Sequence, residues 1–339
     1  MKANLPLVGI TMGDPVGVGP EIIAKALSDP CVLRCCQPVI YGNATRLRAG
    51  AASTGVRLEI AEVPSINDVR IGHHGIPVIN PVAIDTEGLA WGKPTPISGM
   101  AMAAYLNKAI DDAIDGLIAA IATGPINKLA LKMADIPFSG HTEILAERTG
   151  TQNYAMMLAG NRLNVVLATI HIPIEQVPHA LTTQGIATIV TLTDHALKTR
   201  FGLPAPRIAV AGLNPHAGES GLFGVEEQKI IQPAIDLAAS QGIIVTGPHP
   251  PDTIFFKASQ GLFDAVVSMY HDQGLGPFKM IHFDDGVNTT LGLPIVRTSV
   301  DHGTAYDIAG SGEASSASMV AAITMAADQA QWLKRNCRP

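Results

Sequence analysis

Residues 268–297 read SMYHDQGLGPFKMIHFDDGVNTTLGLPIVR, and an apolar run, FDAVV at 263–267, comes directly before them. Such a run predicts a buried strand of a parallel sheet. Ligands of open α/β proteins bind beyond the carboxyl ends of the strands, so functional side chains are expected just after this run. The polar side chains found there are His271, Asp272, Lys279, Asn288 and Arg297. An imidazole, an acid and two cations suit a metal ion and an anionic substrate together; the alternative is a capped turn beside a solvated lysine.

The composition of the chain predicts a globular protein of about two domains. Of its 339 residues, 47% are hydrophobic and 15% are charged, which is enough apolar material for a sizeable core. The net charge of −6 argues against nucleic acid as a partner. No apolar run is long enough to span a bilayer, and residues 1–15 lack the apolar core of a signal peptide. We therefore expect a cytoplasmic protein with no membrane partner.

The chain begins with a strand, a glycine-rich turn and a helix. Residues 5–11 are apolar and predict the strand, residues 12–21 read MGDPVGVGPE, and residues 22–27 continue as a helix. Pro20 and Glu21 are typical of a helix start. A dinucleotide motif GxGxxG would require glycine where the chain has Ile22, and the lysine of a phosphate-binding P-loop is also missing. The pattern favours a purely structural turn.

Further along, residues 97–116 predict an amphipathic helix, residues 117–123 a strand, and residues 314–333 a C-terminal helix. The motif SGHTE at 139–143 predicts another helix start. Ser139 or Thr142 would simply cap this helix in a structural interpretation. In a functional interpretation, His141 and the exposed backbone amides at the helix N-terminus form an anion site.

Three predicted strands are each followed by a histidine within a few residues. The strands cover residues 163–170, 208–213 and 263–267, and the histidines are His171, His216 and His271. Parallel strands place their carboxyl ends at one edge of a sheet, so the three imidazoles are expected to lie close together. Three imidazoles suit a divalent metal ion, and zinc is the first choice, with cobalt or magnesium as alternatives. Asp252 is a candidate for an outer partner of this site.

Five motifs resemble one known family over nearly the whole chain. They are GDPVGVGPE at 13–21, SGHTE at 139–143, LNPHAGE at 213–219, MYHDQG at 269–274 and TLGLPIVRTSVDHGTAYDIAG at 290–310. The family is that of 4-hydroxythreonine-4-phosphate dehydrogenase, including its branch that acts on 4-phospho-D-threonate or 4-phospho-D-erythronate. The resemblance implies NAD-dependent and metal-dependent oxidation of a secondary alcohol, decarboxylation of the 3-keto acid, and a homodimer whose sites use both subunits.

The resemblance also implies the fold and the roles of individual residues. The fold would be that of isocitrate and isopropylmalate dehydrogenases: two α/β domains with central, largely parallel or mixed sheets, flanking helices and an interdomain cleft. The metal ligands would be His171, His216 and His271. The substrate contacts would be His141, Thr142, Lys279, Asn288 and Arg297. Residues 302–310 are similar to an adenosine-binding loop, so NAD, or NADP in its place, is expected at His302, Gly303 and Asp307. The general base would be Lys279, or Asp252 acting through water.

We expect one domain to comprise residues 1–130 and 301–339, and the other, with most metal and substrate residues, to comprise 131–300. Residues 276–278 and 283–287 depart from the pattern of the vitamin B6 enzyme, which favours the sugar-acid branch. The alternatives are an acyl- or phosphotransferase on a similar fold, a dehydrogenase of a non-phosphorylated cis-diol carboxylate, and a binding protein without catalytic activity. The histidine triad argues against the transferase, and retained charged groups argue against an inactive protein.

Overall fold

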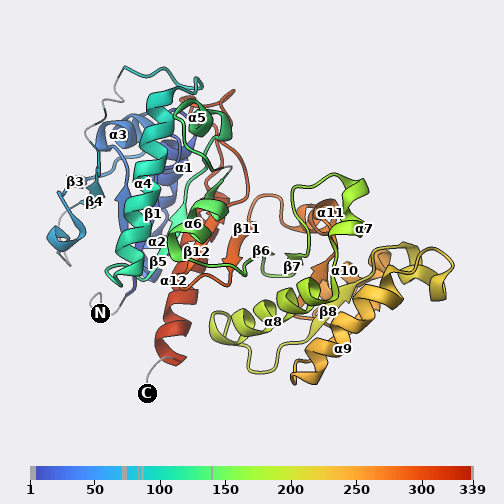
Figure 1. Cartoon of the computed structure of the whole chain (residues 1–339). Helices are drawn as coiled ribbons and strands as arrows, with labels where there is room; N and C mark the ends of the chain where they lie inside the picture. Colours follow the sequence, from blue (N-terminus) through green and yellow to red (C-terminus); the bar gives the residue numbers. More distant parts are fainter. Residues whose placement is uncertain (1–4, 71–74, 83, 85–87, 139, 337–339) are drawn as a thin grey trace. The chain divides into compact units, whose positions relative to one another are not determined.

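The computed structural model describes residues 5–70, 75–82, 84, 88–138 and 140–336 (Figure 1). The chain forms two compact units: unit 1 is Met1–Thr151 with Leu293–Lys334, and unit 2 is Gln152–Gly292 with Arg335–Pro339. The boundaries expected near residues 130 and 300 differ from this division. Unit 1 extends to residue 151 and begins again at residue 293 because Leu145 and Leu293 are buried in its hydrophobic core. His141 and Arg297 therefore belong to unit 1 and not to the unit that carries the three histidines.

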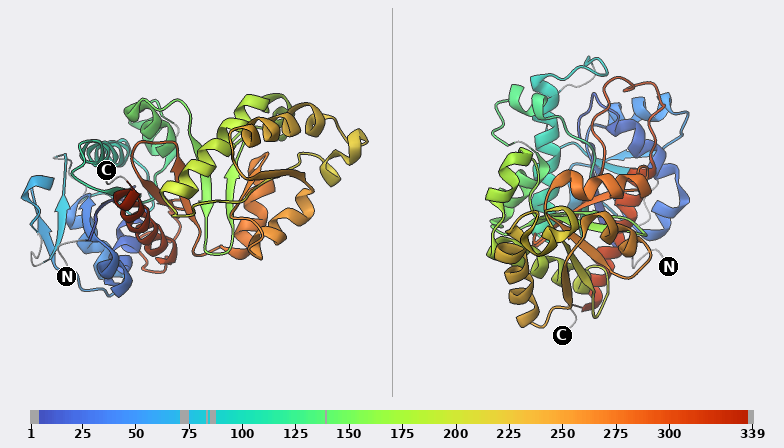
Figure 2. Two further views of the ribbon diagram at one scale, coloured as in Figure 1. Left: turned by 90° about the horizontal axis from the view of Figure 1, so that it is seen from below. Right: turned by 90° about the vertical axis from the view of Figure 1, so that its right-hand side faces the viewer.

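Unit 1 is built on a sheet in which each strand is parallel to its neighbours. In sheet order, the strands are β3 (Ile60–Glu62), β4 (Ile76–Ile79), β2 (Gln37–Tyr41), β1 (Leu7–Thr11), β5 (Ala120–Thr123) and β12 (Arg297–Val300). The helices are α1 (Gly19–Ser28), α2 (Pro30–Cys35), α3 (Ala44–Ser53), the short η2 (Ile66–Asp68), α4 (Pro96–Ile114), α5 (Lys128–Met133), α6 (His141–Thr149) and α12 (Ala317–Asn336). Within this unit, α4 covers one face of the sheet, and α1 and α12 cover the other (Figure 2).

The glycine-rich turn between β1 and α1 is a tightly packed structural element. Gly13 has φ +70°, and a Cβ atom there would lie 2.3 Å from the carbonyl oxygen of Pro125. Asp14 is fully buried, and its Oδ1 accepts a hydrogen bond of 3.0 Å from the backbone N–H of Val16. Its Oδ2 accepts a hydrogen bond from the hydroxyl of Tyr306. The turn thus holds the loop that follows β12, which the sequence alone did not reveal.

Unit 2 has a mixed sheet. In sheet order its strands are β11 (Val287–Leu291), β6 (Ala155–Ala159), β7 (Asn164–Leu167), β10 (Ala265–Ser268), β8 (Ile208–Ala211) and β9 (Val245–His249). Strand β6 is antiparallel to both β11 and β7, whereas β7, β10, β8 and β9 are parallel to one another. Apolar side chains of β7, β8 and β10, among them Val165, Ala209 and Val266, form the core.

The helices of unit 2 lie on both faces of its sheet. They are η3 (Ile174–Gln176), α7 (Val177–Ala180), α8 (Thr183–Thr199), η4 (Pro215–Gly221), η5 (Glu227–Ile231), α9 (Gln232–Ser240), α10 (Pro251–Ser259) and α11 (His271–Ile281). Within this unit, α8 and α9 cover one face, and α10 and α11 cover the other (Figure 2). The predicted α/β class with largely parallel or mixed sheets is confirmed. No helix in the described part of the chain is long and apolar enough to cross a membrane.

Candidate active site

The carboxyl ends of β7, β10 and β8 meet at one edge of the sheet in unit 2. Strand β10 pairs in parallel register with β7, Ser268 opposite Leu167, and with β8 on its other side. The chain segments stay together after the strands end, because the backbone N–H groups of Ala168 and Thr169 donate to the carbonyls of Ser268 and Met269 at 2.8 and 3.2 Å. The residues just beyond β7 and β10 are therefore held side by side.

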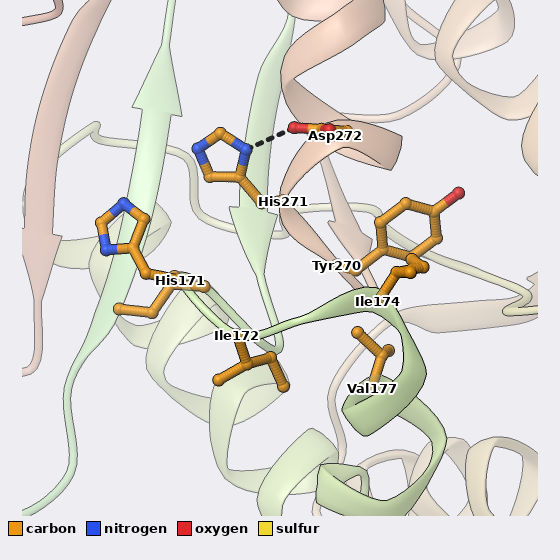
Figure 3. A pocket seen from close by; sticks show the side chains of 8 residues that line it. His171, Ile172, Ile174, Val177, Tyr270, His271 and Asp272 are labelled. Atoms are coloured by element: carbon orange, nitrogen blue, oxygen red, sulfur yellow. Dashed lines mark hydrogen bonds and ion pairs between the residues drawn. The ribbon is translucent and has the colours of Figure 1, made fainter.

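His171 and His271 lie next to each other at this edge. Their ring centroids are 5.6 Å apart and their planes are inclined by 44°. They line a pocket of about 220 Å³ together with Ile170, Ile172, Ile174, Val177, Tyr270 and Asp272. In Figure 3, the two imidazoles lie side by side, apart from the group formed by Tyr270, Ile174 and Val177. Two nitrogen donors thus reach one pocket.

Carboxylates contact two of the three predicted metal ligands. His271 Nδ1 lies 2.7 Å from Asp272 Oδ1, and His216 Nδ1 lies 3.1 Å from Glu219 Oε2. A carboxylate on Nδ1 fixes the tautomer in which Nε2 is left as a metal donor, an arrangement that is common around metal-binding histidines. The donor chemistry of these residues therefore fits a divalent ion such as zinc. The sequence offered a weak signal for Glu219, which comes three residues after His216.

His216 lies on η4, after β8, and does not line this pocket. Gln273 links the two strand ends: its Oε1 accepts from the N–H of Met269 at 2.6 Å, and its Nε2 donates to the carbonyl of Gly212 at 2.7 Å. Among the residues that the structure describes, no three His, Cys, Asp or Glu side chains are gathered as a metal site. The structure brings two of the three predicted ligands together, and binding of one ion by all three stays a prediction.

A second cluster of predicted residues lies in unit 1, around Arg297 at the start of β12. Arg297 is only 2% exposed, and its Nη2 donates to Thr123 Oγ1 at 2.9 Å. Burial lowers the pKa of Arg297 to about 9, although the nearby charge of Glu143 opposes this effect. The cluster therefore presents a guanidinium with little access to water, which is a strong ligand for a carboxylate or phosphate group.

His141 is the first residue of α6, in the same cluster. Burial, and then the charge of Arg297, lowers the pKa of His141 well below its ordinary value. Its Nε2 is covered and has no hydrogen-bond partner within the described residues. The helix is preceded by Gly140 with no side-chain cap, so Thr142 does not cap it; Ser139 lies outside the described residues. The uncapped N-terminus and Arg297 together can bind an anion.

The remaining predicted residues of unit 2 are more scattered. Lys279 lies on α11 in the same helix as His271, with its Nζ 5.6 Å from the centre of the Phe283 ring. Asn288 is on β11, and its Oδ1 is buried with no hydrogen-bond partner in the described part of the chain. Asp252 is exposed in the first turn of α10 and does not line the pocket of His171 and His271.

The residues expected to contact NAD lie in the loop after β12. His302, Gly303 and Asp307 are all exposed, and the ring of His302 approaches the carbonyl of Gly303 through Nδ1 at 2.9 Å. The loop is attached to the glycine-rich turn before α1, because the carbonyl of Thr304 accepts a hydrogen bond from the N–H of Val18 at 3.0 Å. An exposed loop on a fixed base is suited to contact a ligand.

Comparisons with known proteins agree with the resemblance seen in the sequence. The family model of the pyridoxal phosphate biosynthetic protein PdxA matches residues 34–326. A protein of Desulfosudis oleivorans named 4-hydroxythreonine-4-phosphate dehydrogenase is 56% identical over 331 residues, 97% of each chain. A D-threonate 4-phosphate dehydrogenase of Salmonella typhimurium is 44% identical over 319 residues, 94% of this chain and 97% of the relative.

A solved structure extends the match to three dimensions. The crystal structure of a 4-hydroxythreonine-4-phosphate dehydrogenase from Klebsiella pneumoniae is 43% identical, has a TM-score of 0.89, and covers 98% of this chain and 100% of that chain. The relatives are named as dehydrogenases, and a dehydrogenase implies a nucleotide cofactor. The predicted family and enzyme class are thus confirmed. The chain belongs to the family of the pyridoxal phosphate biosynthetic protein PdxA.

Proposed function

We propose that the protein oxidises the 3-hydroxyl of a 4-phosphorylated four-carbon hydroxy acid with NAD and a divalent metal ion, and that the 3-keto acid then loses carbon dioxide. The observation that carries this proposal is the pair of adjoining imidazoles, His171 and His271, in a pocket at the strand ends of a PdxA-family chain. We further propose that it acts as a cytoplasmic homodimer.

His171, His216 and His271 would hold the metal ion, for which zinc suits the imidazole donors. Such an ion would supply Lewis-acid stabilisation of the negative charge that develops on the substrate oxygen during oxidation and decarboxylation. Asp272 and Glu219 would keep the imidazoles of His271 and His216 in the tautomer that leaves Nε2 as the donor.

Arg297, His141 and Thr142 would bind an anionic group of the substrate. The lowered pKa of His141 keeps its imidazole neutral near pH 7, so that Arg297 supplies the positive charge. Displacing water from such a buried guanidinium has little cost, because it is already largely desolvated. Binding would therefore depend on the planar fork of the guanidinium, which grips two oxygens at once.

Lys279 and Asn288 would contribute further contacts to the phosphate or carboxylate. For the general base, we propose Lys279, or Asp252 through a water molecule. Lys279 lies eight positions after His271 on the same helix, α11, so one element carries both side chains. The exposed loop with His302, Gly303 and Asp307 would bind the adenosine part of NAD.

The relatives carry two names that differ in the substrate. Those named 4-hydroxythreonine-4-phosphate dehydrogenase include matches at 54 and 56% identity, and those named D-threonate 4-phosphate dehydrogenase include matches at 42 and 44%. These identities favour hydroxythreonine phosphate, whereas the departures at residues 276–278 and 283–287 favour the sugar-acid branch. The two substrates differ at the carbon next to the carboxylate, which carries an ammonium in hydroxythreonine phosphate and a hydroxyl in threonate phosphate.

The test is formation of NADH and release of carbon dioxide by the zinc-loaded protein. Three substrates would be compared: 4-phosphohydroxythreonine, 4-phospho-D-threonate and 4-phospho-D-erythronate. Turnover of at least one, with equal amounts of NADH and carbon dioxide, is the expected result. NADH without carbon dioxide would remove the decarboxylation step, and no turnover of any of the three would overturn the proposed substrate class.

A further inference from the structure

The turn that carries His216 has an unusual backbone. Residues 216–220 all have positive φ angles, from 43° to 80°. Four of them are not glycine: His216, Ala217, Glu219 and Ser220. Residues with a Cβ atom avoid this left-handed region because the Cβ clashes with backbone oxygen, and a run of such residues is rarer still. Strain of this kind persists only where the surrounding structure imposes it.

Glu227, at the start of η5, binds the segment of chain that leads into this turn. It is only 3% exposed. Its Oε1 accepts hydrogen bonds from the backbone N–H groups of Leu213 and Asn214 at 2.8 and 2.7 Å, and its Oε2 accepts from Asn214 Nδ2 at 3.0 Å. A buried carboxylate with three donors is a firm anchor, because each bond to a charged acceptor is stronger than a neutral one.

The turn folds closely around this carboxylate. A Cβ atom on Gly218 would lie 2.6 Å from Glu227 Oε2, and a Cβ atom on Gly212 would lie 2.9 Å from the Cα of Ala217. The end of the turn is closed by the N–H of Phe223, which donates to the carbonyl of Gly218 at 3.1 Å. The left-handed turn therefore packs directly against the carboxylate of Glu227.

We propose that Glu227 is a positioning residue for His216: its carboxylate fixes the strained left-handed turn and so aims the imidazole, with Glu219 on its Nδ1, at the metal ion. This inference rests on the proposed metal-dependent function. Glu227 lies eleven positions beyond His216 in the sequence and would not touch the ion. It acts through the backbone of residues 213–220.

The test measures binding of Co²⁺ alone to the full-length, metal-stripped protein, by competition with a chelator and by the visible spectrum of bound Co²⁺. In Glu227→Gln, one carboxylate oxygen becomes a donor that faces the N–H donors or Asn214 Nδ2, so the turn relaxes. We expect Co²⁺ affinity to fall about 10- to 100-fold, as is typical when an outer partner of a ligand is lost. The spectrum should change with it, because the donor set changes.

Two control variants separate positioning from general loss of stability. Asp112 is another fully buried carboxylate, in unit 1, which accepts from the hydroxyl of Tyr41 at 2.7 Å. Asp112→Asn should lower the thermal midpoint of the metal-free protein and leave Co²⁺ affinity unchanged. Glu226→Gln alters a neighbouring carboxylate whose Oε2 also accepts from Asn214 Nδ2, at 2.8 Å. This variant leaves the bonds from the backbone N–H groups of Leu213 and Asn214 to Glu227 in place. It should also bind Co²⁺ like the wild type.

The outcomes distinguish this inference from the function on which it rests. If His216→Gln weakens Co²⁺ binding and Glu227→Gln does not, Glu227 has no positioning role, while the metal site stands. If the wild type does not bind Co²⁺, or His216→Gln binds it normally, the proposed metal site fails, and the inference fails with it. If Glu227→Gln does not fold, Gly218→Ala takes its place, because the added Cβ displaces the same carboxylate; wild-type affinity in that variant overturns the proposal.

Discussion

Arg297→Met should leave the ligand-free protein at least as stable as the wild type, while it weakens binding of the substrate. Burial lowers the pKa of Arg297 to about 9. At about 1.4 kcal/mol for each pKa unit, burial of the charged guanidinium costs about 4–5 kcal/mol. This cost is the upper limit of the stability that can be gained by removing the charge. Methionine has a similar length and no charge, so the variant removes this penalty, but it also removes the favourable interaction with the nearby charge of Glu143.

The lost interactions of Arg297, among them those with Glu143 and Thr123, oppose this gain in the free protein. The bond from Arg297 Nη2 to Thr123 Oγ1 contributes about 1 kcal/mol. Thr123 keeps its own hydrogen bond to the carbonyl of Thr298, at 3.2 Å, so its hydroxyl is not left without a partner. We expect the free energy of unfolding to stay level or rise by up to about 3 kcal/mol, and the thermal midpoint to rise by about 2–4 °C for each kcal/mol.

Binding should respond in the opposite direction. A guanidinium gripping an anion through two charge-assisted bonds contributes at least about 3 kcal/mol, so its loss should raise KM about 100-fold or more. Calorimetry of the ligand-free protein and steady-state kinetics measure the two effects. Arg200→Met is a matched control, because Arg200 is 7% exposed and burial lowers its pKa to about 10, yet it lies outside the proposed site. A less stable Arg297→Met with unchanged KM would refute the reasoning and make Arg297 a structural residue.

Three further predictions concern single side chains. The pKa of His141 is lower in the folded protein than in the unfolded chain, so the unfolded chain takes up a proton on this imidazole at a higher pH. The free energy of unfolding should therefore decrease as the pH is lowered from 7 to 5, by up to about 1.4 kcal/mol per pH unit. Denaturant titrations should show a flatter profile for His141→Asn, and an unchanged profile in that variant would exclude His141 as the cause. Gly13→Ala should lower the free energy of unfolding by more than about 2 kcal/mol, because its Cβ would collide with Pro125. Gly116→Ala is the control, because Gly116 has the same φ of +70° but no atom within 4 Å of an added Cβ, and its loss of stability should be clearly smaller. Equal losses in the two variants would exclude the collision as the cause. Asp272→Asn should weaken Zn²⁺ affinity about 10- to 100-fold in chelator competition, since Asp272 contacts His271 Nδ1, and an unchanged affinity would exclude that role.

The sheet edge could be predicted from the sequence because parallel strands leave a direct pattern. The apolar runs before His171 and His271 are buried strands, β7 and β10, and their parallel register places the two imidazoles together. The same pattern predicted a third strand before His216, and β8 is indeed there. The conformation of the chain after β8 was not predictable, since the left-handed turn at 216–220 is built mostly from residues that carry no signal for that conformation.

Other features depend on contacts between distant parts of the chain. Arg297 and Thr123 meet because β12 pairs with β5, a pairing between segments separated by 174 positions. The division into units likewise follows from the packing of Leu145 and Leu293 in one core, which the periodicity of α6 does not reveal. Asp14 looked like an ordinary turn residue, and its bond to Tyr306 becomes visible only when the loop after β12 folds onto the turn.

The most direct test of the proposed mechanism is NAD reduction with a 4-phosphorylated hydroxy acid, measured before and after a chelator removes metal ions from the protein. We predict turnover by the zinc-loaded protein, loss of turnover after chelation, and recovery when Zn²⁺ or Co²⁺ is added back. His271→Gln should show no recovery at the same metal concentration. Undiminished turnover in the stripped protein, or full recovery in His271→Gln, would contradict the claim that the paired histidines hold a metal ion needed for the oxidation.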